Sequence, residues 1–182
     1  VLGTNPIAVG LPTTPPFNLD MSTSAIARGT VLHEKETGGS LPEGVALDSA
    51  GEPTTDPAAA LEGTIRPFGG PKGSGLAIAV EVLAGGLVGA AMGTDVTGTY
   101  HTEDPCTKGD LFLAVDPAAL GSPDFASRAS AFLAGLKDAE RAAGVDEIHL
   151  PGERSVRRDR DCDVVDVDAD RWEEVQRLAG PN

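Results

Sequence analysis

The feature of this sequence most able to do chemistry is a lysine among glycines, at the start of a long apolar run. Residues 67–93 read PFGGPKGSGLAIAVEVLAGGLVGAAMG, with Lys72 just before the apolar part. Free backbone N–H groups and the positive end of the dipole gather at a helix start, where a neighbouring cation helps to bind a phosphate or carboxylate. The spacing matches neither a Walker A loop nor the dinucleotide fingerprint G-x-G-x-x-G. Two interpretations stay open: an anion site, or a loop that turns into a core helix beside a solvated lysine.

Two other groups carry charges that could meet a ligand. Asp20, in NLDMSTS, lies at a strand end, where a carboxylate could bond a ribose hydroxyl, orient a catalytic imidazole or cap backbone N–H groups. Arg154, with Arg157 and Arg158, forms a cationic cluster in an otherwise acidic chain. The alternative for this cluster is a solvated loop balanced by the aspartates of residues 159–163.

The composition narrows the classes of function. The 182 residues include 14 Lys+Arg against 28 Asp+Glu, and this net charge of −14 opposes binding to nucleic acid or to anionic membranes. Cys106 and Cys162 belong to no CxxC and no Cys/His ligand spacing, which predicts reduced thiols, a cytoplasmic location and no metal site. The longest apolar stretch, 76–93, contains Glu81 and several glycines and is too short for a membrane span. Because the chain opens with VLGTNPIAVG and no Met, we expect it to be cut from something longer or to be a processed subunit.

The pattern along the chain predicts an α/β protein. Short strands are expected at residues 7–11, 17–22, 45–48 and 147–150, with a buried strand, DLFLAVD, at 110–116. Helices are expected at 23–36 (with Thr23 or Ser24 as cap), 58–61, 73–91 and 123–143, and in a last segment that Asp168 or Asp170 opens and Gly180-Pro181 ends. The first two strands are joined by too short a connection for a parallel crossover. We therefore expect a three-layer arrangement with a mixed, partly antiparallel sheet.

Three glycines lie inside the predicted helix at 73–91, and each costs about 1 kcal/mol of helix stability relative to alanine. They are Gly85, Gly86 and Gly89. We expect all three to face a neighbouring element, because close packing is the physical reason for a glycine at such a position. A place on the solvent face would contradict this expectation.

Four segments follow one another in an order and spacing that resembles a known enzyme family. They are LGTNPIAVGLPTTPPFNLDMSTSAIARG, LPEGVALDSAGEPTTDPAAAL, PFGGPKGSGLAIAVEVLAGGLVGAAMG and HLPGERS. Together they resemble the type-two malate/L-lactate dehydrogenase family, which includes sulfolactate and ureidoglycolate dehydrogenases, diketogulonate reductase and cyclic-imine-carboxylate reductases. The resemblance runs over essentially all of this chain but covers only the C-terminal part of the family. The family's catalytic His lies upstream in a Ser-His-Gly motif, and none of His33, His101 and His149 lies in such a motif, so no catalytic residue is expected in this chain.

The resemblance implies a fold, an activity and partners. The fold would be a non-Rossmann NAD(P)-binding fold of the sulfolactate-dehydrogenase type, with residues 1–135 as the NAD(P)-binding region and 136–182 as a tail that returns to the catalytic domain. The chain would be the cofactor-binding portion of an oxidoreductase that interconverts 2-hydroxyacids and 2-oxoacids with NAD or NADP, inactive without the upstream half. The alternatives are a cyclic imine (ketimine) reductase of the same family, or a separate non-catalytic subunit or structural module. Expected partners are a 2-oxoacid or imine substrate, the N-terminal half as the same or a separate chain, and further copies in a homodimer or larger oligomer.

The resemblance also transfers the family's cofactor contacts onto three segments of this sequence. They are Pro16, Phe17, Asn18, Leu19, Asp20, Met21 and Ser22 in the first; Pro71 and Lys72 in the second; and Gly152, Glu153 and Arg154 in the third. The resemblance favours the anion-site interpretation of Lys72. These segments are far apart along the chain, so a site requires that the fold bring them together.

Overall fold

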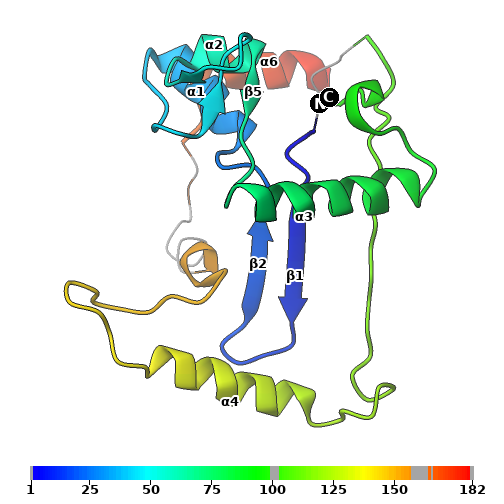
Figure 1. The fold of residues 1–182 in the computed structure, drawn as a ribbon, viewed down its shortest axis with the longest axis vertical. Helices are drawn as coiled ribbons and strands as arrows, with labels where there is room; N and C mark the ends of the chain where they lie inside the picture. The colour runs from blue at the N-terminus through cyan, green and yellow to red at the C-terminus, as the bar shows by residue number, and fades with distance from the viewer. Residues whose placement is uncertain (1, 99–102, 157–163, 165, 181–182) are drawn as a thin grey trace.

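The computed structural model describes residues 2–98, 103–156, 164 and 166–180. In chain order the elements are β1 (Ile7–Leu11), β2 (Phe17–Met21), α1 (Arg28–Thr37), β3 (Ala46–Leu47), β4 (Pro53–Thr54), α2 (Pro57–Glu62), β5 (Thr64–Ile65), α3 (Pro71–Glu81), η1 (Val82–Gly86), η2 (Gly93–Asp95), α4 (Phe125–Lys137) and α6 (Ala169–Ala179). Figure 1 shows an open arrangement in which α3 crosses one end of the β1–β2 hairpin and α4 lies near the other. The α/β class predicted from the sequence is confirmed.

The first two strands form an antiparallel hairpin, as the short connection at 12–16 predicts. Every residue of β1 pairs with one of β2, and β2 ends one residue short of the predicted range 17–22. The chain just before β1 is joined to α3 by Asn5. The Asn5 side-chain amide donates to the Ala77 carbonyl at 2.9 Å and to the Glu81 carboxylate at 2.8 Å. The position of α3 across the hairpin is therefore fixed by polar bonds.

A second small unit packs α1 and α2 against a three-stranded antiparallel sheet of order β4–β3–β5. Its buried core consists of Val31, Leu41, Ala46 and Ala60. α2 begins after Asp56, whose side chain accepts a hydrogen bond from the Ala58 N–H at 2.9 Å, and a proline opens its first turn. The predicted strand at 45–48 and helical turn at 58–61 are confirmed with slightly different bounds.

The helix predicted at 23–36 begins later than expected. α1 starts at Arg28, so Thr23 and Ser24 are not its caps. Their hydroxyls bind backbone carbonyls instead: Thr23 donates to the carbonyl of Thr4 at 3.1 Å, and Ser24 to a carbonyl two residues further on at 2.8 Å. Serine and threonine compete with helix formation in this way, which explains the error.

The glycine-rich helix consists of α3 and the π-helical turn η1, and it ends at residue 86 rather than 91. A Cβ added at Gly85 would lie 2.7 Å from Met92 Cγ, and one at Gly86 would lie 3.0 Å from Met92 Sδ. The prediction that these glycines face a neighbouring segment is confirmed for Gly85, which is buried, whereas Gly86 is exposed although a Cβ there would contact Met92. It is wrong for Gly89, which follows the helix with a φ of +76° and open space at its Cβ position. Glycine is favoured at position 89 because the backbone there is in the left-handed region, and not because a side chain would clash with a neighbour.

The buried strand predicted at 110–116 is not formed within this chain. The segment runs extended but lies outside both sheets, and Phe112 is 92% exposed and Leu113 85% exposed. No backbone hydrogen bond among the described residues uses the N–H or C=O groups of residues 111–115. Residues 110–116 have the apolar pattern of a buried strand, but the described part of the chain does not cover these side chains.

The later elements agree with the sequence in part. α4 covers 125–137 rather than 123–143, and 147–150 is not a strand, because it forms no ladder with a described strand and Glu147 instead pairs with Lys137 of α4. α6 has Asp168 at its start, where the side chain accepts from the Arg171 N–H at 3.2 Å, and it ends at Gly180. The predicted boundaries of the last helix are confirmed.

Both sheets in the described residues are antiparallel. The described chain therefore does not itself form the mixed, three-layer sheet, which stays a prediction for the larger fold. A search of the described helices finds none with the length and apolar character that a membrane crossing requires.

Candidate functional site

β2 carries the first of the three segments assigned to a cofactor. Its side chains alternate, with Phe17, Leu19 and Met21 partly buried and Asn18 and Asp20 exposed, because successive residues of a strand point to opposite faces. The Asp20 carboxylate takes part in no hydrogen bond or ion pair within the described residues, so it caps no backbone N–H group there. The structure therefore does not support backbone capping by Asp20. Its carboxylate is exposed to solvent on β2 of the hairpin.

The third segment lies directly against β2. The Asn18 N–H donates to the Pro151 carbonyl at 3.1 Å. Gly152 has a φ of +89°, and a Cβ added to it would lie 2.8 Å from the Asn18 carbonyl oxygen and 2.9 Å from Asn18 Cβ. Only glycine allows this close approach of the two backbones. Residues about 130 positions apart in the sequence are thus brought into contact.

Glu153 is tied into a network with α4 by its side chain. One carboxylate oxygen accepts from Lys137 Nζ at 2.6 Å and the other from the Leu150 N–H at 2.9 Å, and only 10% of the side chain is exposed. The hydrogen bond to Glu153 raises the pKa of Lys137, partial burial opposes this, and the hydrogen bond to Glu147 raises it further. The Glu153 carboxylate therefore anchors the turn at 150–153 to the end of α4.

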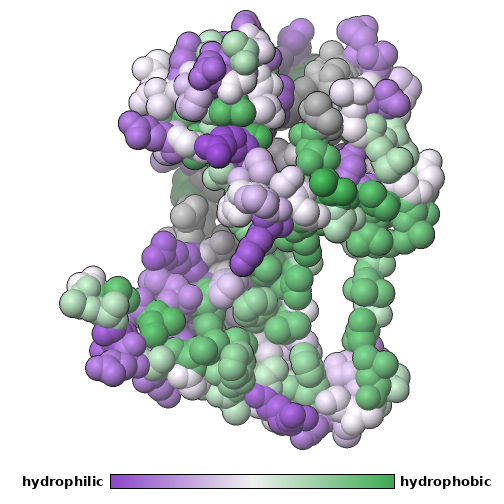
Figure 2. All heavy atoms as spheres, viewed as in Figure 1, coloured by the Kyte–Doolittle hydropathy of each residue, from purple (hydrophilic) through white to green (hydrophobic). Residues whose placement is uncertain are grey.

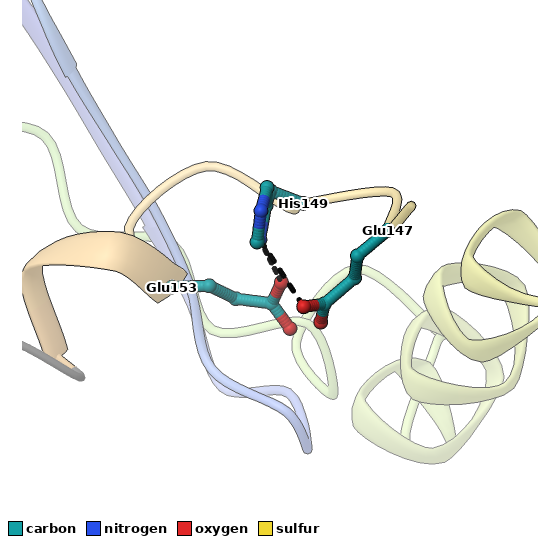
Figure 3. A group of neighbouring side chains, drawn as sticks. All are labelled: Glu147, His149 and Glu153. Carbon is teal, nitrogen blue, oxygen red and sulfur yellow. Dashed lines mark ion pairs between the residues drawn. The ribbon is translucent and has the colours of Figure 1, made fainter. Parts of the chain in front are cut away.

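A histidine joins the same cluster. Figure 3 shows His149 beside Glu147 and Glu153, and its Nδ1 lies 3.9 Å from an oxygen of each carboxylate. These three residues offer donor atoms within 4.8 Å of one another, which a metal ion could bridge. The Lys137 ammonium already lies 3.4 Å from Glu147 and 2.6 Å from Glu153 and supplies the positive charge between them. We therefore describe the group as an ion-pair cluster, and the sequence-based expectation of no metal site stays a prediction.

The second segment opens α3. Gly69 and Gly70 both have positive φ values, and a Cβ at Gly73 would collide with the Phe68 carbonyl, so the glycines are required by the shape of this turn. Lys72 is exposed and forms no ion pair or side-chain hydrogen bond within the described residues. The backbone N–H groups of Lys72 and Gly73 are also unpaired there, as expected for the first turn of a helix. A free cation and two free N–H groups thus lie side by side.

The start of α3 lies beyond the end of β2. The Phe68 N–H donates to the Thr23 carbonyl at 3.0 Å, and Ser24 pairs with Pro67 in an isolated β-bridge. The turn at 150–153 meets the other end of β2, at Asn18. Asn18 and Thr23 are five positions apart along the chain, which corresponds to at most roughly 16 Å at 3.3 Å per residue of strand. The structure therefore arranges the three segments along one strand, with the second and third near opposite ends of the first.

Two parts of this arrangement differ from what the sequence indicated. Lys137 was not among the candidate residues, because its two partners lie 10 and 16 positions away on a loop and no spacing rule connects them. Arg154 is exposed next to the turn. The companions predicted for it, Arg157 and Arg158, lie outside the described residues.

Comparisons with known proteins agree on one family. The family model described as malate/L-lactate dehydrogenase matches residues 1–176. The L-sulfolactate dehydrogenase of Methanocaldococcus jannaschii is 44% identical over 181 residues, which cover 98% of this chain and 52% of that enzyme. A solved structure of sulfolactate dehydrogenase from the same organism matches with a TM-score of 0.86 at 43% identity, over 97% of this chain and 52% of the other.

Two further relatives differ in the reactions that their names state. The delta(1)-pyrroline-2-carboxylate reductase of Ancylobacter novellus is 39% identical over 190 residues, covering 100% of this chain and 53% of the enzyme. The (2R)-3-sulfolactate dehydrogenase (NADP(+)) of Chromohalobacter salexigens is 39% identical over 163 residues, covering 87% of this chain and 47% of the enzyme. The chain spans about half the length of the curated relatives that it matches. By these matches, which run over nearly its whole length, the chain belongs to the malate/L-lactate dehydrogenase family.

Proposed function

We propose that this chain is the cofactor-binding portion of an NAD(P)-dependent oxidoreductase that interconverts 2-hydroxyacids and 2-oxoacids. The observation that carries the proposal is the arrangement of three distant segments along the single strand β2. A dinucleotide is an extended anionic ligand, and a site for it needs contacts distributed along a line rather than in one compact pocket. The named sulfolactate dehydrogenases among the relatives support the substrate class.

The residues present fit such a ligand in charge and in shape. Lys72 and the free N–H groups at the start of α3 offer positive charge and donors to a phosphate. Asp20 offers an acceptor to ribose hydroxyls, and Arg154 adds a second cation next to the turn at 150–153. Gly152 keeps this turn in contact with β2. The bound cofactor would supply hydride transfer, while these groups bind and orient it.

Within this proposal, Glu153 has a different role from the direct cofactor contact expected from the sequence. Its carboxylate is held by Lys137 and by the Leu150 N–H, so the side chain fixes the turn, which contacts β2 through the Pro151 carbonyl and Gly152. Proton transfer to the substrate is assigned to a histidine outside this chain, as the family resemblance implies. The chain would then be inactive without the part of the fold that carries this histidine.

A cyclic imine reductase is the second candidate function, because the Ancylobacter novellus relative is named as a delta(1)-pyrroline-2-carboxylate reductase. In both cases a hydride is accepted at a carbon next to a carboxylate, so the same cofactor site would serve both. A separate non-catalytic module is the third candidate. It differs from the others in that the purified protein would contain no second polypeptide or extension with a Ser-His-Gly motif, which an intact mass measurement reveals.

Several finer expectations belong to this proposal. The cofactor site would be of non-Rossmann type, which agrees with the lack of a G-x-G-x-x-G fingerprint. The division between the NAD(P)-binding region and the tail, placed at residues 135 and 136, falls in the last turn of α4. NAD and NADP both remain candidates, and we propose a cytoplasmic homodimer or larger oligomer.

The proposal is tested by titrating the complete enzyme with NADH and NADPH and following nicotinamide fluorescence. The Lys72→Met variant removes the charge and keeps most of the stem length. Loss of a charge-assisted hydrogen bond should weaken cofactor binding by about 1.5–3 kcal/mol, on the order of ten- to a hundredfold. Lys35→Met is the matched control, since Lys35 is an exposed lysine on α1 away from β2. An affinity changed equally little by both substitutions would contradict a role for Lys72.

The substrate class needs a separate measurement. NADH and NADPH oxidation should be followed with a series of 2-oxoacids, including a sulfonated one, and with five- and six-membered cyclic imine carboxylates. Turnover of the 2-oxoacids and not of the imines is the expected result. The reverse preference would replace the dehydrogenase with the imine reductase and leave the cofactor site intact.

A further inference from the structure

One carboxylate interrupts the apolar helix that begins beside Lys72. Glu81 is the only charged residue in the sequence between Lys72 and Asp95, and Figure 2 shows hydrophobic side chains along this helix on the face in view. The Glu81 side chain is half-buried, and both of its oxygens accept hydrogen bonds: Oε2 from the Asn5 side-chain amide at 2.8 Å and Oε1 from the Gly93 N–H at 2.6 Å. A carboxylate partly removed from water costs free energy unless its oxygens are bonded in this way. Glu81 therefore joins three segments of the chain at the end of α3.

Its partner Asn5 is held in an uncommon backbone conformation. Among the described residues it is the one non-glycine residue with a positive φ, +38°. Residues with a side chain adopt this region at a cost, which asparagine tolerates better than most. Both hydrogens of the Asn5 amide are donated to α3, one to the Ala77 carbonyl and one to Glu81. Such a conformation persists where the surrounding contacts fix it, and the contacts that the Asn5 side chain makes here all lead to α3.

The preceding residue, Thr4, connects this contact to the chain just beyond β2. The Thr4 carbonyl accepts from the Thr23 N–H at 2.9 Å and from the Thr23 hydroxyl at 3.1 Å. Thr23 is 1% exposed, and its own carbonyl accepts from the Phe68 N–H just before α3. α3 is therefore tied to the hairpin at both ends: near its start through Thr23 and Phe68, and near its end through Asn5 and Glu81.

We propose that Asn5 and Glu81 are positioning residues for the cofactor site, and that they act through Lys72 at the opposite end of α3. The inference rests on the proposed function, in which Lys72 and the free N–H groups at the helix start bind a phosphate. Glu81 lies nine residues after Lys72, about 14 Å along the helix at 1.5 Å per residue. A helix of this length moves as a rod, so releasing its end lets it pivot about the contacts near Phe68 and turns Lys72 away from its position beside β2. A binding group must be held closely in place to be effective, which is what the bonds at the far end of α3 supply.

A reciprocal pair of substitutions tests the contact between Asn5 and Glu81. Glu81→Gln keeps the length of the side chain but leaves one acceptor oxygen where two are used, so the bond to Asn5 or the bond to Gly93 is lost. Asn5→Asp places two carboxylates against each other. Each substitution should weaken NADH binding to the complete enzyme by about threefold to tenfold. Made together, they again set a donor against an acceptor and leave an oxygen for the Gly93 N–H, so the paired variant should recover more affinity than either single variant has.

A double-variant cycle with Lys72→Met separates positioning from a purely structural role. In the otherwise unmodified enzyme, Glu81→Gln should weaken NADH binding by about threefold to tenfold. In an enzyme that already carries Lys72→Met, the same substitution should change the affinity by less than about twofold, because the group that it positions is gone. The urea midpoint should shift equally in both backgrounds, since the hydrogen bond lost within the protein is the same. Affinity losses that simply add would overturn the inference.

The same measurements distinguish failure of this inference from failure of the proposed function. A loss of affinity with Lys72→Met but none with Glu81→Gln would overturn the positioning role alone, as would a paired Asn5→Asp, Glu81→Gln variant with no recovery. Unchanged affinity with Lys72→Met would overturn the role of Lys72 in the proposed function and this inference with it. Glu62→Gln is the matched control, because Glu62 is an exposed glutamate at the end of α2, and it should leave affinity within about twofold.

Discussion

Two glycine-containing turns, one in contact with Asn18 and one just beyond the other end of β2, are built in opposite ways. In the turn at 150–153 the charged side chain of Glu153 is bound to Lys137, and the turn contacts β2 through the Pro151 carbonyl and Gly152. In the turn at 69–73 the glycines shape the backbone, and Lys72 together with two N–H groups has no partner in the described chain. The charge of Glu153 therefore holds its own turn in place, whereas the charge of Lys72 is free to meet a ligand.

This difference shows which features of a family motif act on a ligand and which hold the motif in place. Both turns were assigned to the cofactor from the sequence, with charged residues in each. The structure distinguishes them by the partners of those charges. A charge that is already paired within the protein is less available to a ligand than an unpaired cation at a helix start. Substitutions at the two turns should therefore differ in whether they lower stability, cofactor affinity or both.

The largest effect is expected at Gly152. Gly152→Ala places a Cβ 2.8 Å from the Asn18 carbonyl at a φ of +89°, so the turn must leave β2. We expect a loss of about 3 kcal/mol in the free energy of unfolding from combined clash and backbone strain. Cofactor affinity should fall by more than about a hundredfold, because two of the three segments separate. Urea unfolding and NADPH titration of the complete enzyme measure both quantities.

Gly121→Ala is the matched control for this substitution. Gly121 has a φ of +79° but open space at its Cβ position, so only backbone strain is added, about 1–2 kcal/mol. Its cofactor affinity should equal that of the unmodified enzyme. If Gly152→Ala and Gly121→Ala lowered stability and cofactor affinity equally, the clash with Asn18 would add nothing to the effect of backbone strain.

A smaller effect is expected at Lys137. Lys137→Met leaves Glu153 in place without its cation, so the turn should loosen and cofactor affinity should fall by about threefold to tenfold. Lys108→Met removes an exposed lysine whose partner, Asp110, is also exposed, and it should change affinity less than about twofold. Titration of the two variants side by side decides whether the cluster positions the turn, since equal affinities would show that it does not.

The same pair predicts a pH dependence. The pKa of Lys137 in the folded chain lies above its ordinary value of 10.5, chiefly through the hydrogen bond to Glu153. A group whose pKa is raised by folding contributes stability that is fully present below its unfolded pKa and is lost as pH rises through the folded pKa. The stability difference between the unmodified chain and Lys137→Met should be constant from neutral pH to about pH 10 and shrink above it. Chemical unfolding at a series of pH values checks this, and a difference that instead shrinks toward acid pH would contradict it.

Local sequence signals predicted much of the fold. The hairpin follows from two short apolar runs around a proline-rich turn, and the last helix follows from Asp168 and Gly180 at its ends. The glycine-rich helix was found, and Gly85 is buried against Met92 as expected, whereas Gly86 and Gly89 are exposed. Errors arose where a side chain binds backbone in place of capping, as at Thr23, or where the described residues supply no partner for a segment, as at 111–115.

The site could be predicted only as three separate segments. Their residues came from the family resemblance, and no periodicity or spacing indicates that 150–153 meets Asn18. The role of Glu153 could not be read from its motif, because it depends on Lys137 at the end of a helix that was predicted to extend six residues further. Long-range pairs of this kind are set by the packing of whole elements.

We expect the three segments along β2 to bind one ligand, and a hydrogen-exchange footprint of the complete enzyme tests this. Exchange is measured with and without saturating NADPH or NADH. Amides at 18–21, at Lys72 and Gly73, and at 152–154 should slow together, by at least about tenfold, while those of α1 and α2 should not change. Slowing at only one of the three segments, or at none of them, would contradict a shared site along this strand.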